Sequence, residues 1–149
     1  MKKLLLFVGI ITLLSCSSNE EETKTKLEVI LNPPAWINGT WYSESIGNND
    51  YGWIFTDGNA IRMNQGSEQV NIKESTTSSL NGRDYLNQQS DFVKEIILDN
   101  RYSIEIEYHD PARPSIDHEV LYEFIKISDT EIEWTTAPTS VKPLIMKKQ

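Results

Sequence analysis

The stretch YSIEIEY at Tyr102–Tyr108 decides the fold of this chain. Apolar or aromatic side chains alternate with polar ones along its whole length. The first set is Tyr102, Ile104, Ile106 and Tyr108, and the second set is Ser103, Glu105 and Glu107. Successive side chains of a strand point to opposite faces of its sheet, so this alternation is typical of a strand with one buried face and one solvated face.

Short apolar-rich runs separated by Gly, Asn, Asp or Pro flank this strand on both sides. The expected strands are residues 41–45, 51–56, 60–64, 68–73, 92–98, 102–108, 118–127, 131–135 and 143–148. Asp57-Gly58 is a strong hairpin signal, because glycine accepts a positive φ angle. Residues 74–91 are rich in Ser, Thr, Asn and Gln and predict a long loop or one weak strand. No helix longer than a turn or two is expected.

Eight or nine strands at short spacing predict an antiparallel all-β domain, either a barrel or a sandwich. Closure into a barrel removes the exposed edges of a sheet, which favours the barrel. We therefore predict a single antiparallel up-and-down β-barrel of about eight strands.

The beginning of the chain has the pattern of a targeting signal. Residues 1–3 are Met-Lys-Lys, and residues 4–14 (LLLFVGIITLL) form an apolar run. A membrane-spanning helix needs about 20 apolar residues, so this run has the proportions of a signal-peptide core. It ends in Leu13-Leu14-Ser15-Cys16, which resembles the lipobox of bacterial lipoproteins. The resemblance implies cleavage before Cys16 and acylation of its sulfur with palmitate-type chains, and two or more such chains anchor a protein durably.

A polar segment, SSNEEETKTK at residues 17–26, follows Cys16 and predicts a flexible tether. Its acidic residues are similar to the export signals of surface-exposed lipoproteins in Bacteroidetes-type bacteria, and a plain spacer is the alternative. We expect a signal peptide at 1–15, a lipidated N-terminus and tether at 16–34, and one domain at 35–149. The expected location is the cell envelope, lipid-anchored at the outer membrane, with surface exposure as the orientation that the acidic residues favour.

Charge and cysteine content exclude several classes of function. Removing residues 1–15 takes away Lys2 and Lys3, which leaves 12 basic against 22 acidic residues and a net charge of −10. Nucleic-acid binding needs clusters of Lys and Arg, so no nucleic-acid partner is expected. A basic amphipathic helix for lying on a membrane is also missing from the pattern, so the lipid anchor is the expected membrane contact. Cys16 is the only cysteine, so the domain has no internal disulfide.

The segment WINGTW at residues 36–41 stands at the start of the first expected strand. Its Gly39-Thr40-Trp41 resembles the Gly-x-Trp opening of lipocalins, and more closely that of the small lipocalin-like domains of bacterial lipoproteins. The resemblance implies that Trp41 plugs one end of the barrel and that a turn at residues 34–38 closes that end. Lipocalins set an arginine from the last strands against this tryptophan in a cation–π contact. No arginine is present there in this chain, so Lys142 or Lys147 is expected to take its place.

Residues with catalytic or metal-binding chemistry are sparse. The chain has no G-x-S-x-G frame, no spare cysteine and no glycine-rich phosphate loop, so we expect neither an enzyme nor a cofactor. His109-Asp110 and Asp117-His118 flank one loop, and two imidazoles with two carboxylates are a donor set for a divalent metal. Polar residues at strand ends are common, however, so no metal site is assigned.

Aromatic residues carry the functional hypotheses, because an eight-stranded barrel is just wide enough to be filled by side chains or to hold one small ligand. The first hypothesis is a carrier that binds a small hydrophobic molecule or lipid inside the barrel. Its expected ligand-binding residues are Trp41, Trp53, Phe55, Tyr102, Ile104 and Ile106. The alternative is a filled barrel that contacts a protein or glycan through its outer face or through loops such as residues 47–50. An interior cavity of about 300 Å³ or more would favour the carrier, and a packed interior would favour the alternative.

Overall fold

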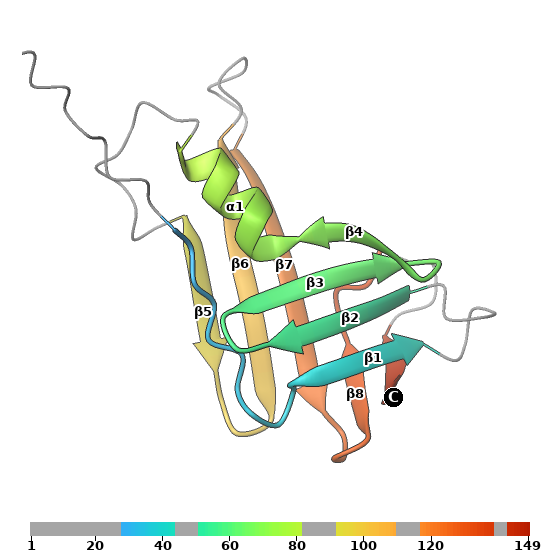
Figure 1. Ribbon diagram of the computed structural model, residues 1–149. Coiled ribbons are helices and arrows are strands. Elements are labelled where there is room, and N and C mark those ends of the chain that lie inside the picture. The colour runs from blue at the N-terminus through green and yellow to red at the C-terminus, as the bar shows by residue number, and fades with distance from the viewer. Residues whose placement is uncertain (1–27, 44–50, 82–91, 110–116, 139–142) are drawn as a thin grey trace, which may run out of the picture.

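The computed structural model describes residues 28–43, 51–81, 92–109, 117–138 and 143–149, which form nine strands and one helix (Figure 1). The strands are β1 (Gly39–Ser43), β2 (Tyr51–Thr56), β3 (Asn59–Asn64), β4 (Ser67–Asn71), β5 (Val93–Ile97), β6 (Arg101–His109), β7 (Asp117–Lys126), β8 (Glu131–Trp134) and β9 (Leu144–Lys148), and the helix is α1 (Ile72–Asn81). They form one antiparallel sheet in the order β4-β3-β2-β1-β9-β8-β7-β6-β5. Apart from the β1–β9 pair, neighbours in the sheet are neighbours in the chain.

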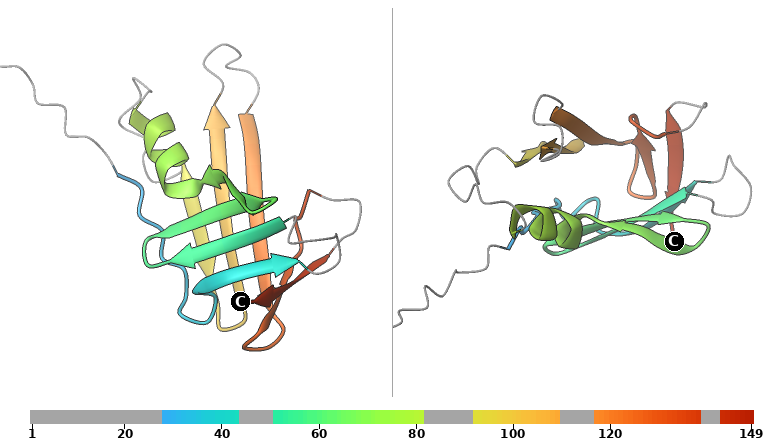
Figure 2. Two further views of the ribbon diagram at one scale, coloured as in Figure 1. Left: turned by 45° about the vertical axis from the view of Figure 1, so that its right-hand side comes forward. Right: turned by 90° about the horizontal axis from the view of Figure 1, so that it is seen from above.

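The sheet curls into a half-barrel, with β1–β4 in one layer and β5–β8 in the other (Figures 1 and 2). The layers join where β1 pairs with β9 and stand apart on the opposite side, where the sheet ends at β4 and at β5. The antiparallel, up-and-down, all-β prediction is confirmed. The nine strands agree with the expected eight or nine, and β4 and β5 do not pair in the described part of the chain. The gap between these two ends has β5 on one side and β4 with α1 on the other, and we call it the seam.

Strand β6 shows the predicted alternation. Tyr102, Ile104 and Ile106 are fully buried, whereas Glu107 is exposed. Ser103 differs from the expectation, because it belongs to the polar set but is only 1% exposed. In the register it lies between Ile96 of β5 and Glu123 of β7, and these larger neighbours cover its short side chain.

The hairpin between β2 and β3 has the predicted turn. Strand β2 covers Tyr51–Thr56, and its last residue pairs with Asn59. Asp57 and Gly58 therefore form a two-residue loop. Gly58 has φ +85°, a conformation that glycine adopts without steric cost, so the hairpin prediction is confirmed.

Helix α1 shows that the prediction of a strand to residue 73 followed by a loop is wrong. Ile72, Thr76 and Leu80, four residues apart, are buried, so the helix turns one face to the core. The side chain of Asn71 caps the helix by accepting a hydrogen bond from the third helical amide at 3.2 Å. Ser and Thr are weak helix formers, which is why tertiary burial rather than local propensity decides this element. Within the described residues no helix has the length and apolarity to span a membrane.

Residues 28–32, which we call the strap, run along the seam and bond to both layers (Figure 1). Three strap amides donate hydrogen bonds, to Thr77 Oγ1 of α1 at 2.9 Å, to Gly58 O at 3.2 Å and to the Glu95 carboxylate of β5 at 2.9 Å. The side chain of Leu31 is 1% exposed and belongs to the core. Residues 28–32, which the sequence prediction placed in the tether, therefore pack against the domain.

Candidate functional site

The six residues predicted to line a ligand cavity lie together in the core of the half-barrel. Trp41, Trp53, Phe55, Tyr102, Ile104 and Ile106 come from β1, β2 and β6, and each is 0% or 1% exposed. Side chains that line an empty cavity are reachable by water, and these six are not. They pack against other side chains, so the interior around them is filled. Their role in ligand binding stays a prediction.

Trp53 is at the centre of an aromatic cluster that joins the two layers. Its ring centroid lies 5.6 Å from that of Phe55, 5.1 Å from that of Phe124 and 5.3 Å from that of Trp134. The last two contacts are edge-to-face, the arrangement that aromatic pairs prefer. The sequence prediction placed Phe124 and Trp134 in strands but not in the site. Trp134 has polar neighbours on both sides, and this alternation is the signal that places it inside, whereas Phe124 is followed by Ile125 and has a weaker signal.

The ring of Trp41 is fixed from two sides. Its Nε1 donates a hydrogen bond to Ile37 O at 2.6 Å, and Lys148 Nζ lies over the ring, 5.1 Å from its centroid. The expected cation was Lys142 or Lys147. Lys148 takes this place because it pairs directly with Trp41 in the β1–β9 register, and directly paired residues share a face of the sheet. Lys142 lies outside the described residues.

Gly39 leaves room for this cation. It has φ +131°, and a Cβ atom at this position would lie 2.7 Å from Lys148 Cε. The turn expected just before it is present, because the Ile37 amide donates to Pro34 O at 3.0 Å. The local geometry of the Gly-Thr-Trp segment is therefore that of a turn leading into β1 beneath a cation–π contact.

Glu95 links three parts of the structure at the seam. It pairs with Ile104 in the β5–β6 register, which places it on the inner face. Its Oε1 accepts hydrogen bonds from the Tyr102 hydroxyl at 2.6 Å and from the Asn32 amide at 2.9 Å. Burial, and then the hydrogen bond and negative charge of Glu95, raise the pKa of Tyr102 far above its ordinary value. A neutral phenol therefore holds β6 to β5 and the strap through one carboxylate.

Tyr102→Phe is expected to change the alkaline stability of the protein. The variant loses a hydrogen bond to a charged group, about 1.5–3 kcal/mol at neutral pH. Because the pKa of Tyr102 is raised by folding, its stabilisation is fully present below the unfolded pKa of about 10 and is lost as the pH rises above it. When thermal unfolding is measured from pH 7 to 11, the melting temperature of the variant should therefore fall less steeply above pH 10 than that of the wild-type protein. Equal slopes in both proteins would contradict the assignment.

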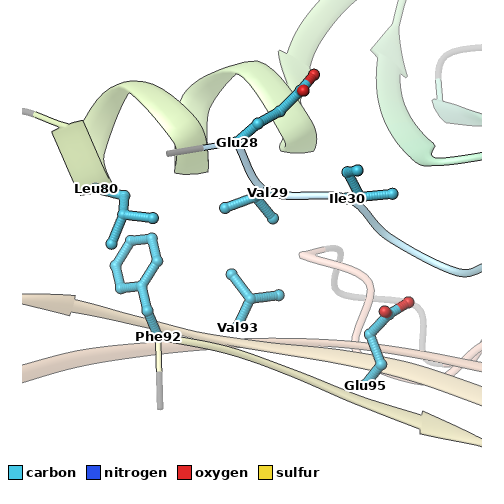
Figure 3. A pocket seen from close by; sticks show the side chains of 7 residues that line it. All are labelled: Glu28, Val29, Ile30, Leu80, Phe92, Val93 and Glu95. Atoms are coloured by element: carbon cyan, nitrogen blue, oxygen red, sulfur yellow. The ribbon is translucent and has the colours of Figure 1, made fainter. Parts of the chain in front are cut away.

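A pocket of about 180 Å³ opens at the seam between the strap, α1 and β5 (Figure 3). Its lining residues are Glu28, Val29, Ile30, Leu80, Phe92, Val93 and Glu95. Figure 3 shows the side chain of Leu80 of α1 pointing toward Phe92, which directly precedes β5, and the side chain of Val29 facing Val93. Pockets for drug-sized ligands measure about 300–1,000 Å³. The seam pocket is therefore large enough for a small apolar group and too small for a lipid.

Aliphatic side chains are exposed on the outer face of β5 and β7 and at Leu98 and Ile127, which directly follow these strands. We call Ile96, Leu98, Leu121 and Ile127 the outer patch, and their exposed fractions are 46%, 52%, 40% and 50%. They alternate with residues that face the interior, such as Glu95 and Tyr122, and so project from the opposite side of the sheet. The sequence prediction missed this patch, because the apolar run at residues 96–98 has no alternation that would mark which side chains are exposed.

Charged side chains lie among the residues of the outer patch, because Glu105 of β6 stands between Lys94 of β5 and Leu121 of β7 in the register. Lys94 Nζ lies 3.3 Å from Glu105 Oε1 and 3.4 Å from Glu107 Oε1, and hydrogen bonding and charge from Glu105, and then from Glu107, raise the pKa of Lys94. Arg101 forms an ion pair with Glu123. Exposed pairs of this kind contribute little to stability. The outer face of β5–β7 therefore mixes exposed aliphatic groups with ion pairs.

Of the histidine-flanked loop, the structure describes the backbone pairing at its two ends. In the β6–β7 register, His109 pairs with Asp117 and Tyr108 pairs with His118, so the two histidines occupy different register positions. Across the described ranges, no group of three or more His, Cys, Asp or Glu side chains is placed to hold a metal ion.

Several predicted features lie outside the described residues. They are the lipidation site Cys16, the tether at residues 17–26 and the loop at residues 47–50. The functional reading of these segments stays a prediction from the sequence. Comparisons with protein-family models, with curated proteins and with solved structures give no match for this chain.

Proposed function

We propose that this protein is a lipid-anchored, non-catalytic binding module of the bacterial cell envelope and that its partner is a protein. The sequence supports the anchor, because Cys16 follows a signal-like apolar run and precedes a polar tether. Anchoring at the outer membrane, with the domain exposed at the surface, is part of the same proposal. The observation that carries the binding function is the outer patch, whose side chains are 40–52% exposed on a sheet with a filled inner face. Exposed apolar groups that gather on one face are a feature of interaction sites.

The chemistry of the exposed side chains favours a protein over a glycan. Among the described residues, the exposed large hydrophobic side chains are all Ile or Leu. Sugar rings bind by stacking on exposed aromatic rings, and the aromatic rings described here are directed to the core or half-buried. Aliphatic groups interspersed with ion pairs are complemented by another protein surface.

A carrier of a small hydrophobic molecule or lipid remains the alternative proposal. A ligand inside the barrel would require Trp53, Phe55 and Tyr102 to separate, with loss of their ring contacts. The seam pocket, about 180 Å³, does not replace an interior cavity for such a ligand. Because the packed core opposes the carrier function, we place the binding function on the outer surface.

A photo-reactive amino acid at Ile96 or Leu121 is expected to give a discrete cross-linked protein in living cells of the host bacterium. Both positions belong to the outer patch, whereas Glu68 on β4 is an exposed control on the other layer. The adduct should be several-fold stronger at the patch positions, and mass spectrometry of the excised band identifies the partner. Absence of adducts from the patch, or the same adducts from all three positions, would contradict the proposed function.

A further inference from the structure

Strand β5 is one end of the sheet, and in the described part of the chain no strand pairs with its outer edge. Two hydrogen bonds show which backbone groups face β6: the Leu98 amide donates to it at 2.8 Å, and the Phe92 carbonyl accepts from it at 3.1 Å. Backbone groups of an antiparallel strand alternate between its two edges. Even-numbered residues therefore bond to β6, whereas Val93, Glu95 and Ile97 direct their N–H and C=O groups to the outer edge.

The two ends of the sheet differ in how their edges are protected. In β4, residues 67–69 are polar and exposed, the β3–β4 register shifts once, and the strand passes directly into α1. These are devices by which native sheets prevent edge pairing. Strand β5 has two charged residues, Lys94 on the outer face and Glu95 on the inner face, but no proline and no register shift against β6. Ile96 and Ile97 are each 46% exposed, one on each face. Such an edge is a template for another strand.

We propose that the outer edge of β5 receives the protein partner as an added strand in which aliphatic and basic residues alternate. This inference rests on the proposed function and specifies how the partner binds beside the outer patch. On the outer face, aliphatic side chains of the added strand lie next to Ile96 and Leu98. On the inner face, Glu95 takes hydrogen bonds from the neutral groups of Asn32 and Tyr102, and no cation pairs with it among the described residues. A basic side chain opposite Glu95 supplies that cation.

A second copy of this chain does not fit the same edge. Bonded pairs on the outer edge join odd-numbered residues, so β5 paired with itself sets Glu95 opposite Val93, Glu95 or Ile97. None of these registers brings a cation to the inner face, because Lys94 lies on the outer face with Glu105. Like charges directly opposite each other are destabilising, and the net charge of −8 adds repulsion between copies.

Amide hydrogen exchange of the full chain in detergent, resolved by NMR, tests whether the edge is free. We expect the amides of Val93, Glu95 and Ile97 to exchange at least about 100-fold faster than the even-numbered amides of β5. An added strand should slow the odd-numbered set selectively. Equal protection of both sets in the free protein would mean that the edge is already covered, which overturns the proposal.

The probe for the added strand is a capped octapeptide of alternating lysine and valine. Its lysines lie opposite the odd-numbered residues of β5, so their amides form the bonds across the edge. N-methylation of the lysine amides removes these donors, whereas N-methylation of the valine amides changes only the far edge of the peptide. All three peptides have the same charge. We expect the lysine-methylated peptide to bind at least about tenfold more weakly than the other two, which should protect the odd-numbered amides.

The outcomes separate this inference from the proposed function. Equal binding of the three peptides would show side-chain attraction without strand addition, and failure of the unmodified peptide to bind would also overturn the inference. If photo-cross-links from Ile96 and Leu121 persist in either case, the proposed function stands without it. If those cross-links are absent too, both fail. If sedimentation velocity shows a dimer, and the dimer no longer binds the peptide, a second copy of the chain occupies the edge. That result would overturn the stated partner.

Discussion

Replacing Trp53 with alanine is expected to lower the free energy of unfolding by about 3–5 kcal/mol. Trp53 is fully buried, and its ring lies 5.0–5.6 Å from the four rings of Phe55, Tyr122, Phe124 and Trp134. Its removal deletes contacts between the two layers and leaves a cavity that a hydrogen-bonded sheet cannot collapse to fill. Typical domains are stable by about 5–15 kcal/mol, so the loss is a large fraction of the total. Denaturant unfolding followed by circular dichroism measures it.

Trp53→Phe is the matched control for this prediction. It keeps a ring at the centre of the cluster, and the indole Nε1 that it removes has no hydrogen-bond partner among the described residues. We therefore expect a cost of about 1–2 kcal/mol for the phenylalanine variant. A cost of less than about 1 kcal/mol for Trp53→Ala would contradict a tightly filled interior.

Leu31→Ala, in the strap, is expected to cost about 2–4 kcal/mol of unfolding free energy. Leu31 is 1% exposed, and the strap to which it belongs bonds to α1, to the β2–β3 turn and to β5. The adjacent Ile30 is 60% exposed and serves as the control. Ile30→Ala should change stability by less than about 0.5 kcal/mol, because an exposed side chain loses little on truncation.

Limited proteolysis of the same two variants separates strap release from a general loss of stability. In Leu31→Ala we expect faster cleavage within residues 28–34 than in the rest of the domain, because the strap loses its one fully buried side chain. If the two variants are equally stable and are cleaved alike, the strap is not docked, and the domain begins near residue 35 after all.

Local patterns account for most of the fold. The alternation in Tyr102–Tyr108 identified β6 and its buried face, and Asp57-Gly58 identified the β2–β3 hairpin. Helix α1 could not be found in this way, because Ser and Thr fill most of its turns and its buried stripe becomes visible only against β3. The strap is a similar case, since its bonding partners Gly58 and Glu95 are distant in the sequence.

The candidate site could be predicted only in part for the same reason. Alternation placed Trp53, Phe55 and Tyr102 inside the sheet, and all three are buried. Whether a buried aromatic face encloses a cavity depends on the volume of the rings that meet it from β7 and β8, which a local pattern does not contain. The cation over Trp41 depends on the β1–β9 register, and the outer patch depends on β5 being the last strand of the sheet.

Native mass spectrometry of the full chain, extracted gently from its host membrane, tests the filled interior most directly. We expect the mass of the chain with its attached lipid and no further adduct, before and after incubation with fatty acids and isoprenoids. Trp53→Ala is the positive control, because its new apolar cavity should accept indole. A stoichiometric extra mass on the wild-type chain that disappears on extraction with organic solvent would contradict the filled interior and establish the barrel as a carrier.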